Sequence, residues 1–179
     1  MKRLMLLAVA LVLLAACGAG PGSKPAAYAG QVCGAISAYE KTLTTQGTAY
    51  ATAEKAAGQD PVKLQKATGT FLGQQVAGSA TLLSTLQQIT RPQGSGGQQV
   101  QDTFVSTARN IHASLRTQQQ QVATADASNQ VTFFQVLNTA QEQFAKVDQD
   151  LATALETVAA QGSQRLNDAF AADQTCSSL

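Results

Sequence analysis

Two arginines and a histidine recur at steps of three and four residues in the middle of the chain. They are Arg109, His112 and Arg116, and His112 is the single histidine of the sequence. Side chains at this spacing share one face of an α-helix, so the three could together bind an anion or an acidic partner protein. The alternative is a solvated or salt-bridged helix face, because the stripe flanks the apolar positions of its segment.

Three cysteines, Cys17, Cys33 and Cys176, are the other reactive side chains. One histidine cannot complete a metal-ligand set with cysteines so far apart. The sequence has no Gly-x-Ser-x-Gly or Ser-x-x-Lys motif, and the glycines of 94–97 are not followed by the Lys-Ser/Thr of a phosphate-binding loop. We therefore expect no catalytic residue, metal or cofactor.

The N-terminus has the layout of a secretory signal peptide. A positive start, Met1-Lys2-Arg3, precedes the apolar run 4–14, which is shorter than the about 20 residues that a bilayer requires. The exit, Leu14-Ala15-Ala16-Cys17, resembles the lipobox of bacterial lipoproteins. That resemblance implies that residues 1–16 are removed and that Cys17 carries a diacylglyceryl group. The alternative is an ordinary signal peptide in which this cysteine occurs by chance.

A lipidated Cys17 places the protein on the extracytoplasmic face of the cell membrane, because two or more acyl chains anchor a protein stably. Residues 17–25 are rich in glycine and proline, which predicts a flexible tether. Residues 26–179 remain as one domain, long enough to bury a core.

With Cys17 lipidated, Cys33 and Cys176 are left. An oxidising compartment beyond the export step favours a disulfide between them. The alternative is two unpaired, buried thiols.

The composition excludes some partners. Without Lys2 and Arg3, ten basic residues face eleven acidic ones, a net charge of about −1. Such a chain has neither the basic bias of a nucleic-acid-binding protein nor a polybasic face for anionic lipid.

The residues that follow the tether predict helices throughout, since Ala, Gln, Leu, Glu and Lys dominate. Apolar residues at alternating steps of four and three predict helices over about 26–57, 61–89 and 98–126. A fourth stripe follows a turn near 127–129 and is the most regular: Phe133, Leu137, Ala140, Phe144, Val147, Leu151, Ala154 and Val158.

Four helices of similar length with short connections predict an all-α, up-down-up-down four-helix bundle. A straight fourth helix would carry Cys176 roughly 30 Å past Cys33, at 1.5 Å per residue. We therefore predict a break at 161–163 and a short fifth helix over 165–172, with Leu166 and Phe170 facing inward. The disulfide would then close the bundle.

The layout resembles small helical lipoproteins of bacterial cell envelopes, of actinobacterial type, a resemblance that implies no particular activity. Our first hypothesis is a membrane-tethered, non-enzymatic module that binds an envelope protein or has a structural role. This hypothesis predicts a filled apolar core. The alternative is a binding protein for a small amphipathic or apolar ligand, with a cavity near Gly69, Gly73 and Gly78, although these glycines also suit close helix packing. An enzyme would require Arg116, Glu142 and Asp148 to converge in one pocket.

Overall fold

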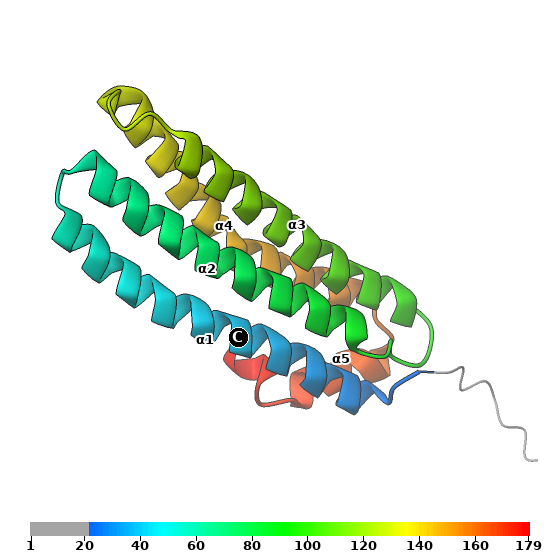
Figure 1. Ribbon diagram of the computed structural model, residues 1–179. Helices are drawn as coiled ribbons and strands as arrows, with labels where there is room; N and C mark the ends of the chain where they lie inside the picture. The colour runs from blue at the N-terminus through cyan, green and yellow to red at the C-terminus, as the bar shows by residue number, and fades with distance from the viewer. Residues whose placement is uncertain (1–21) are drawn as a thin grey trace, which may run out of the picture.

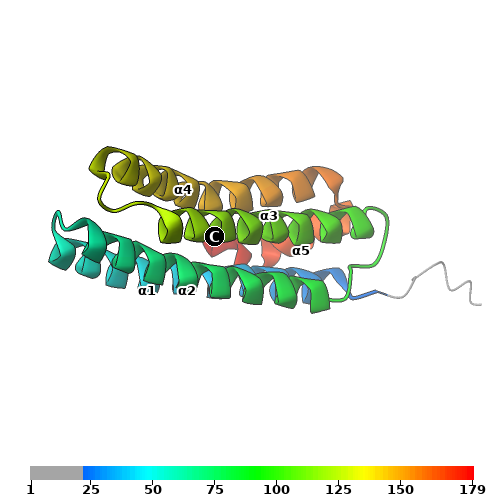
Figure 2. The ribbon, with the colours of Figure 1, turned by 45° about the horizontal axis from the view of Figure 1, so that its top comes forward.

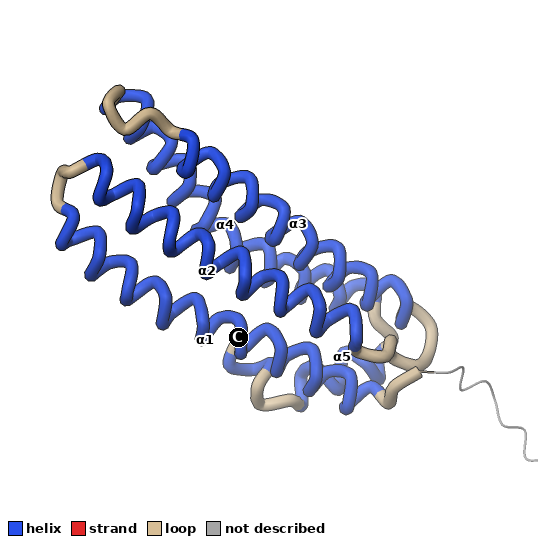
Figure 3. The backbone as a smooth tube through the Cα atoms, in the orientation of Figure 1, coloured by secondary structure: helices blue, strands red, loops and turns tan. Residues whose placement is uncertain are grey.

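The computed structural model describes residues 22–179, which form an all-helical bundle (Figure 3). The elements in chain order are α1 (Pro25–Ala57), α2 (Pro61–Gln88), α3 (Gly97–Thr124), α4 (Gln130–Gln161), α5 (Gln164–Ala172) and the 3₁₀ turn η1 (Cys176–Ser178). The predicted signal peptide and Cys17 lie outside the described residues. Among the helices of residues 22–179, none is both long and apolar enough to cross a membrane.

The four long helices lie side by side, and their connections alternate between two ends (Figures 1 and 2). Helices consecutive in sequence pack together from α1 to α4, and α5 packs against α1. One end, which we call the proximal end, carries the start of α1 and the α2–α3 loop. The distal end carries the turn between α1 and α2 and the turn between α3 and α4 (Figure 1).

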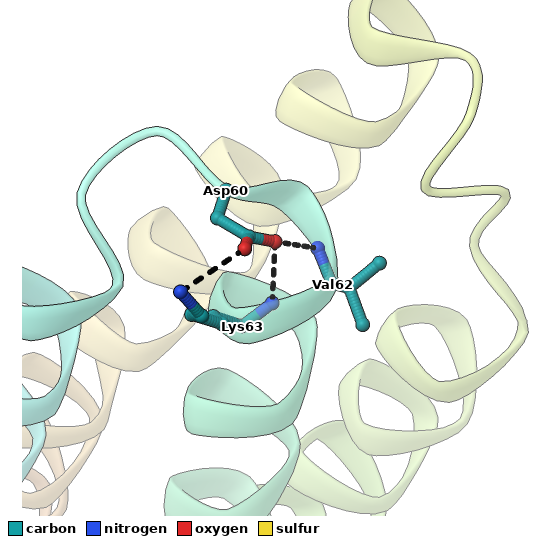
Figure 4. A network of polar contacts seen from close by, with 3 residues as sticks. All are labelled: Asp60, Val62 and Lys63. Carbon is teal, nitrogen blue, oxygen red and sulfur yellow. Dashed lines mark hydrogen bonds and ion pairs between the residues drawn. The ribbon is translucent and has the colours of Figure 1, made fainter.

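The helix boundaries follow local capping chemistry. Asp60 caps α2, because its Oδ1 accepts from the amides of Val62 at 3.0 Å and Lys63 at 3.1 Å, while Oδ2 lies 3.3 Å from Lys63 Nζ (Figure 4). These contacts, led by the Lys63 amide, lower the pKa of the Asp60 carboxyl. Pro61 occupies the first helical position, where its missing amide costs nothing.

The predicted break after the fourth helix is confirmed. The amide of Gly162 donates to the Val158 carbonyl and ends α4, and the Ser163 hydroxyl accepts from the Leu166 amide and begins α5. Leu166 is 1% exposed, and Phe170 packs against Tyr28 and Phe104 with ring centroids 6.1 and 6.0 Å apart. The short fifth helix thus turns back along α1 as the distance argument requires.

The first helix begins at Pro25, one residue earlier than the predicted start of the domain at residue 26. Pro25 is the first residue of α1, where a proline is favoured rather than disruptive. Ser23 pairs with the α2–α3 loop: its amide donates to the Arg91 carbonyl at 2.9 Å, and its carbonyl accepts from the Gln93 amide at 2.9 Å. Residues 22–25 are therefore attached to the bundle rather than part of a free tether.

The core consists of the predicted apolar stripes. Fully buried side chains come from every helix: Tyr28, Val32, Ile36, Leu72, Leu86, Val100, Phe104, Ile111, Leu115, Phe133 and Leu166. Phe144 is the member of the fourth stripe that stays half-buried. Its ring centroid lies 5.0 Å from that of Phe71 on α2, and its side chain lines a groove between α1 and α4.

Candidate functional site

The disulfide between Cys33 and Cys176 is confirmed, with Cα atoms 5.1 Å apart. It joins α1 to η1, across 143 residues of sequence. Asp173 positions the second cysteine, because its Oδ1 accepts from the amides of Thr175 at 2.9 Å and Cys176 at 3.1 Å. A Cβ at Gly30 would approach Asp173 Oδ2 to 3.2 Å, so a small residue there gives the carboxylate room.

The arginine–histidine stripe lies on α3, where Arg109 and Arg116 are exposed and His112 is half-buried. His112 points towards α2, with its Nδ1 atom 3.1 Å from the hydroxyl oxygen of Ser79. That hydroxyl also lies 3.0 Å from the Val76 carbonyl. A hydroxyl has one hydrogen, so donation to Val76 leaves Ser79 Oγ to accept from an Nδ1–H of His112.

This Ser–His pair is arranged for packing rather than for nucleophilic chemistry. Ser79 is 0% exposed, so no substrate reaches its oxygen, and its hydrogen is engaged by a backbone carbonyl. A nucleophilic serine requires an accessible oxygen whose proton passes to the histidine. The stripe as an anion or partner site therefore depends on Arg109 and Arg116, and remains a prediction.

A set of polar side chains is buried between the helices, and the sequence reasoning did not single it out. Gln75 is 0% exposed, and its Nε2 donates to Gln46 Oε1 at 2.7 Å. Thr68 is 3% exposed and bonds the Tyr50 hydroxyl at 3.1 Å. Gln118 is 7% exposed. The signal was present, because Gln118 continues the four-three spacing between Leu115 and Val122.

Three oxygen atoms of this region are buried without a hydrogen-bond partner among residues 22–179. They are the Tyr39 hydroxyl and the Oε1 atoms of Gln75 and Gln118. A buried polar atom without a partner costs about 1–3 kcal/mol. Each of these three atoms therefore lowers the stability of the fold by an amount of that order.

Two connected grooves follow the outer face of the α1–α2 pair. The distal groove, of about 480 Å³, reaches the α1–α2 turn and is lined by Gln46, Ala49, Tyr50, Ala53, Ala56, Ala57, Lys63, Lys66, Ala67, Thr70, Phe71 and Gln74. Stacking of Tyr50 on Phe71, with centroids 4.7 Å apart, forms the apolar part of its wall. The central groove, of about 620 Å³, shares Gln46 and Gln74 and continues past Gly78. Both volumes lie within the range of small-molecule sites.

The three glycines of α2 have different surroundings. A Cβ at Gly78 would lie 3.3 Å from the ring of Tyr39, and one at Gly73 would lie 3.2 Å from Gln119 Nε2. Close packing therefore accounts for both. Gly69 has nothing within 4 Å of a Cβ position, and close packing does not explain it.

A further groove separates α1 from α4, the two helices at the ends of the packing order. This seam groove, of about 730 Å³, is lined by Glu40, Leu43, Thr44, Gly47, Phe144, Asp148, Leu151, Ala152, Leu155 and Leu179. Burial, and secondly the charge of Asp148, raise the pKa of the Glu40 carboxyl. Of the set that an enzyme would have required, Asp148 lines this groove, and Arg116 and Glu142 do not. All three side chains are exposed.

Within residues 22–179, no group of three or more His, Cys, Asp or Glu side chains is arranged to hold a metal ion. Neither a protein-family model, nor a curated protein, nor a solved structure matches the chain. The class is therefore defined by the fold itself: an all-helical bundle with a disulfide between its first helix and its C-terminal turn.

Proposed function

We propose that this chain is a membrane-tethered envelope lipoprotein that acts without catalysis, as an interaction module whose distal end binds another envelope protein. The architecture we propose for it is an up-down-up-down four-helix bundle with a short fifth helix. The alternating connections and the packing of consecutive helices support this architecture.

The proposal rests on where apolar side chains are exposed. In the described part of the chain, the large hydrophobic residues that are exposed are Val62 at 67%, Val131 at 72% and Phe134 at 37%. Val62 lies in the first turn of α2, and the other two in the first turns of α4. Both turns belong to the distal end (Figure 1). Because all three exposed side chains lie at the distal end, we place the binding surface there.

The position of the tether supports the same orientation. Cys17 precedes Gly22 by five residues, a span of at most about 17 Å, and Gly22 is attached to the proximal end. A lipid on Cys17 would therefore hold the proximal end near the membrane. With 33 residues, α1 is about 50 Å long, and the distal end would project by that length.

Fractionation tests the tether. Cys17→Ala should move the protein from the membrane fraction to the soluble fraction, because the lipid acceptor is lost. Ala19→Ser, which keeps Leu14-Ala15-Ala16-Cys17, should leave it in the membrane. Tight membrane association of Cys17→Ala would overturn the anchor.

Photocrosslinking tests the distal surface. A photoreactive phenylalanine analogue at Phe134 should give discrete adducts with an envelope protein in intact cells. The same analogue at Gln98, which is exposed at the start of α3 at the proximal end, should not. Identical adducts from both positions, or none from Phe134, would contradict the proposal.

The distal groove supports a second candidate, the binding of a small amphipathic ligand. Its wall combines Tyr50 and Phe71 with alanines, and Lys63 and Lys66 are its charged residues. An anionic head group would meet these lysines while an apolar tail lies along the alanines. Native mass spectrometry of protein purified from its own envelope should then show a small non-covalent adduct, which Ala53→Trp removes by filling the groove.

A further inference from the structure

The seam groove lies between α1 and α4, beside the short helix α5. At the proximal end, α5 and η1 pack against α1, and Phe170 of α5 contacts Phe104 on α3. Figure 2 shows α5 and the C-terminus between α1 and the α3–α4 pair. Leu179, just after η1, lines the groove. Leu179 and the α5–η1 segment therefore border the proximal side of the groove.

The far side of the groove is bounded by a direct contact between the same two helices. Gln141 Nε2 on α4 lies 3.4 Å from Glu54 Oε1 on α1. Between this contact and Leu179, the lining of α4 runs from Phe144 to Leu155, or about 16 Å at 1.5 Å per residue. This length corresponds to three turns of helix.

The lining of the seam groove has a definite chemistry. Leu43, Leu151, Phe144 and Leu155 form an apolar surface, the first two buried and the other two half-buried. Glu40 contributes a carboxylate from α1 and Asp148 contributes one from α4, and no lysine, arginine or histidine lines the groove. The carboxylates of Glu40 and Asp148 repel each other across the groove. A positive group between them would attract both.

We propose that the seam groove docks a short, basic, amphipathic helix of a partner protein. Its apolar residues, at i, i+3, i+4 and i+7, would cover Leu43, Phe144 and Leu155. A lysine or arginine on its flank would lie between Glu40 and Asp148. The occupant is a helix because the same inter-helix space holds α5, and it is basic because the groove carries two carboxylates. This surface is separate from the distal end, and the inference does not depend on the membrane tether.

A designed peptide pair tests the charge requirement. The probe is a 14-residue helical peptide with leucines at i, i+3, i+4 and i+7 and lysines on the flanks of that stripe, and its partner carries glutamates at the lysine positions. The full chain should bind the lysine peptide and not the glutamate peptide. Glu40→Gln and Asp148→Asn should each weaken binding about tenfold, the equivalent of one charge-assisted hydrogen bond. Asp102→Asn, which removes one exposed negative charge on α3, should leave it unchanged.

Hydrogen exchange identifies the location. The lysine peptide should protect amides in 40–47 and 144–155. Equal binding of the two peptides, unchanged affinity in both groove variants, or protection confined to other segments would overturn the proposal. Protection of 40–47 and 144–155 by dodecylamine when the peptide gives none would overturn the helix as the occupant.

Discussion

Ser79 on α2 and His112 on α3 are joined by a hydrogen bond of 3.1 Å between Oγ and Nδ1. It is one of several hydrogen bonds between the two helices, beside those from Gln65 Nε2 to the Val122 carbonyl at 2.8 Å and from Gln101 Nε2 to the Leu86 carbonyl at 2.6 Å. It directs the histidine of the arginine stripe inward. The pair orients His112 towards α2, so that Arg109 and Arg116 are the exposed members of the stripe.

Double substitution tests this coupling. Ser79→Ala and His112→Ala should each destabilise the domain by about 1 kcal/mol, because each leaves the other partner without its bond. The double variant should be more stable than the sum of the two effects predicts, by about 0.5–1.5 kcal/mol. Urea unfolding of the four proteins measures the cycle. Full additivity would show that the two side chains act independently.

The disulfide should supply a large part of the stability. A loop closed across 143 residues restricts the unfolded chain strongly, and removal of a native disulfide typically costs about 2–5 kcal/mol. Cys33→Ser with Cys176→Ser should therefore lower the free energy of unfolding by that amount. The doubly substituted protein should unfold at the same urea concentration before and after reduction, whereas the native protein should shift. Alkylation of Cys33 or Cys176 in unreduced native protein, located by peptide mass mapping, would contradict the bond.

The buried glutamines differ in what they bond, which makes them a matched pair. Gln118 Oε1 is buried without a partner among residues 22–179, so Gln118→Met, which preserves the length of the side chain, should stabilise the domain by about 1 kcal/mol. Gln75 Oε1 is buried without a partner as well, but Gln75 Nε2 donates to Gln46 Oε1 at 2.7 Å. Gln75→Met also loses that bond and should therefore give no net gain. Thermal unfolding compares the two. A loss of stability in Gln118→Met would indicate that its amide group is satisfied.

Local sequence signals predicted the helices well because the chemistry of each boundary is local. Asp60 followed by Pro61 sets the start of α2, and Gly162 with Ser163 sets the break that brings Cys176 back to Cys33. The grooves could not be predicted in the same way. Phe144 follows the same four-three spacing as its neighbours, yet it is half-buried, because the space between α1 and α4 depends on where α5 and Leu179 lie.

The position of His112 shows the same limit. Its spacing with Arg109 and Arg116 correctly placed the three on one helix. Its contact with Ser79 depends on how α2 and α3 are aligned along each other. The spacing of residues within one helix does not predict that alignment. Gln118, by contrast, was visible in the spacing of α3 and could have been assigned to the core on that ground.

The stability of the domain should depend on pH through Glu40 in the seam groove. Burial, and then the charge of Asp148, raise the pKa of Glu40 above its ordinary value. A carboxyl whose pKa is raised by folding binds its proton more tightly in the folded state, so its contribution favours folding at low pH and is lost as the pH rises through the folded-state pKa. At neutral pH the ionised Glu40 therefore opposes folding.

Glu40→Gln should accordingly be more stable than the native protein at pH 7, and the difference should disappear as the pH falls below about 4.3, the pKa of glutamate in an unfolded chain. The gain in stability from Glu40→Gln at pH 7 should be smaller when Asp148→Asn is also present, because the charge of Asp148 is the second cause of the raised pKa of Glu40. Urea midpoints measured from pH 3 to pH 7 on the native protein and both variants provide the comparison. A Glu40→Gln protein that is less stable than the native one at pH 7 would mean that a positive group faces Glu40, and that the seam groove lacks the negative character on which its proposed occupant depends.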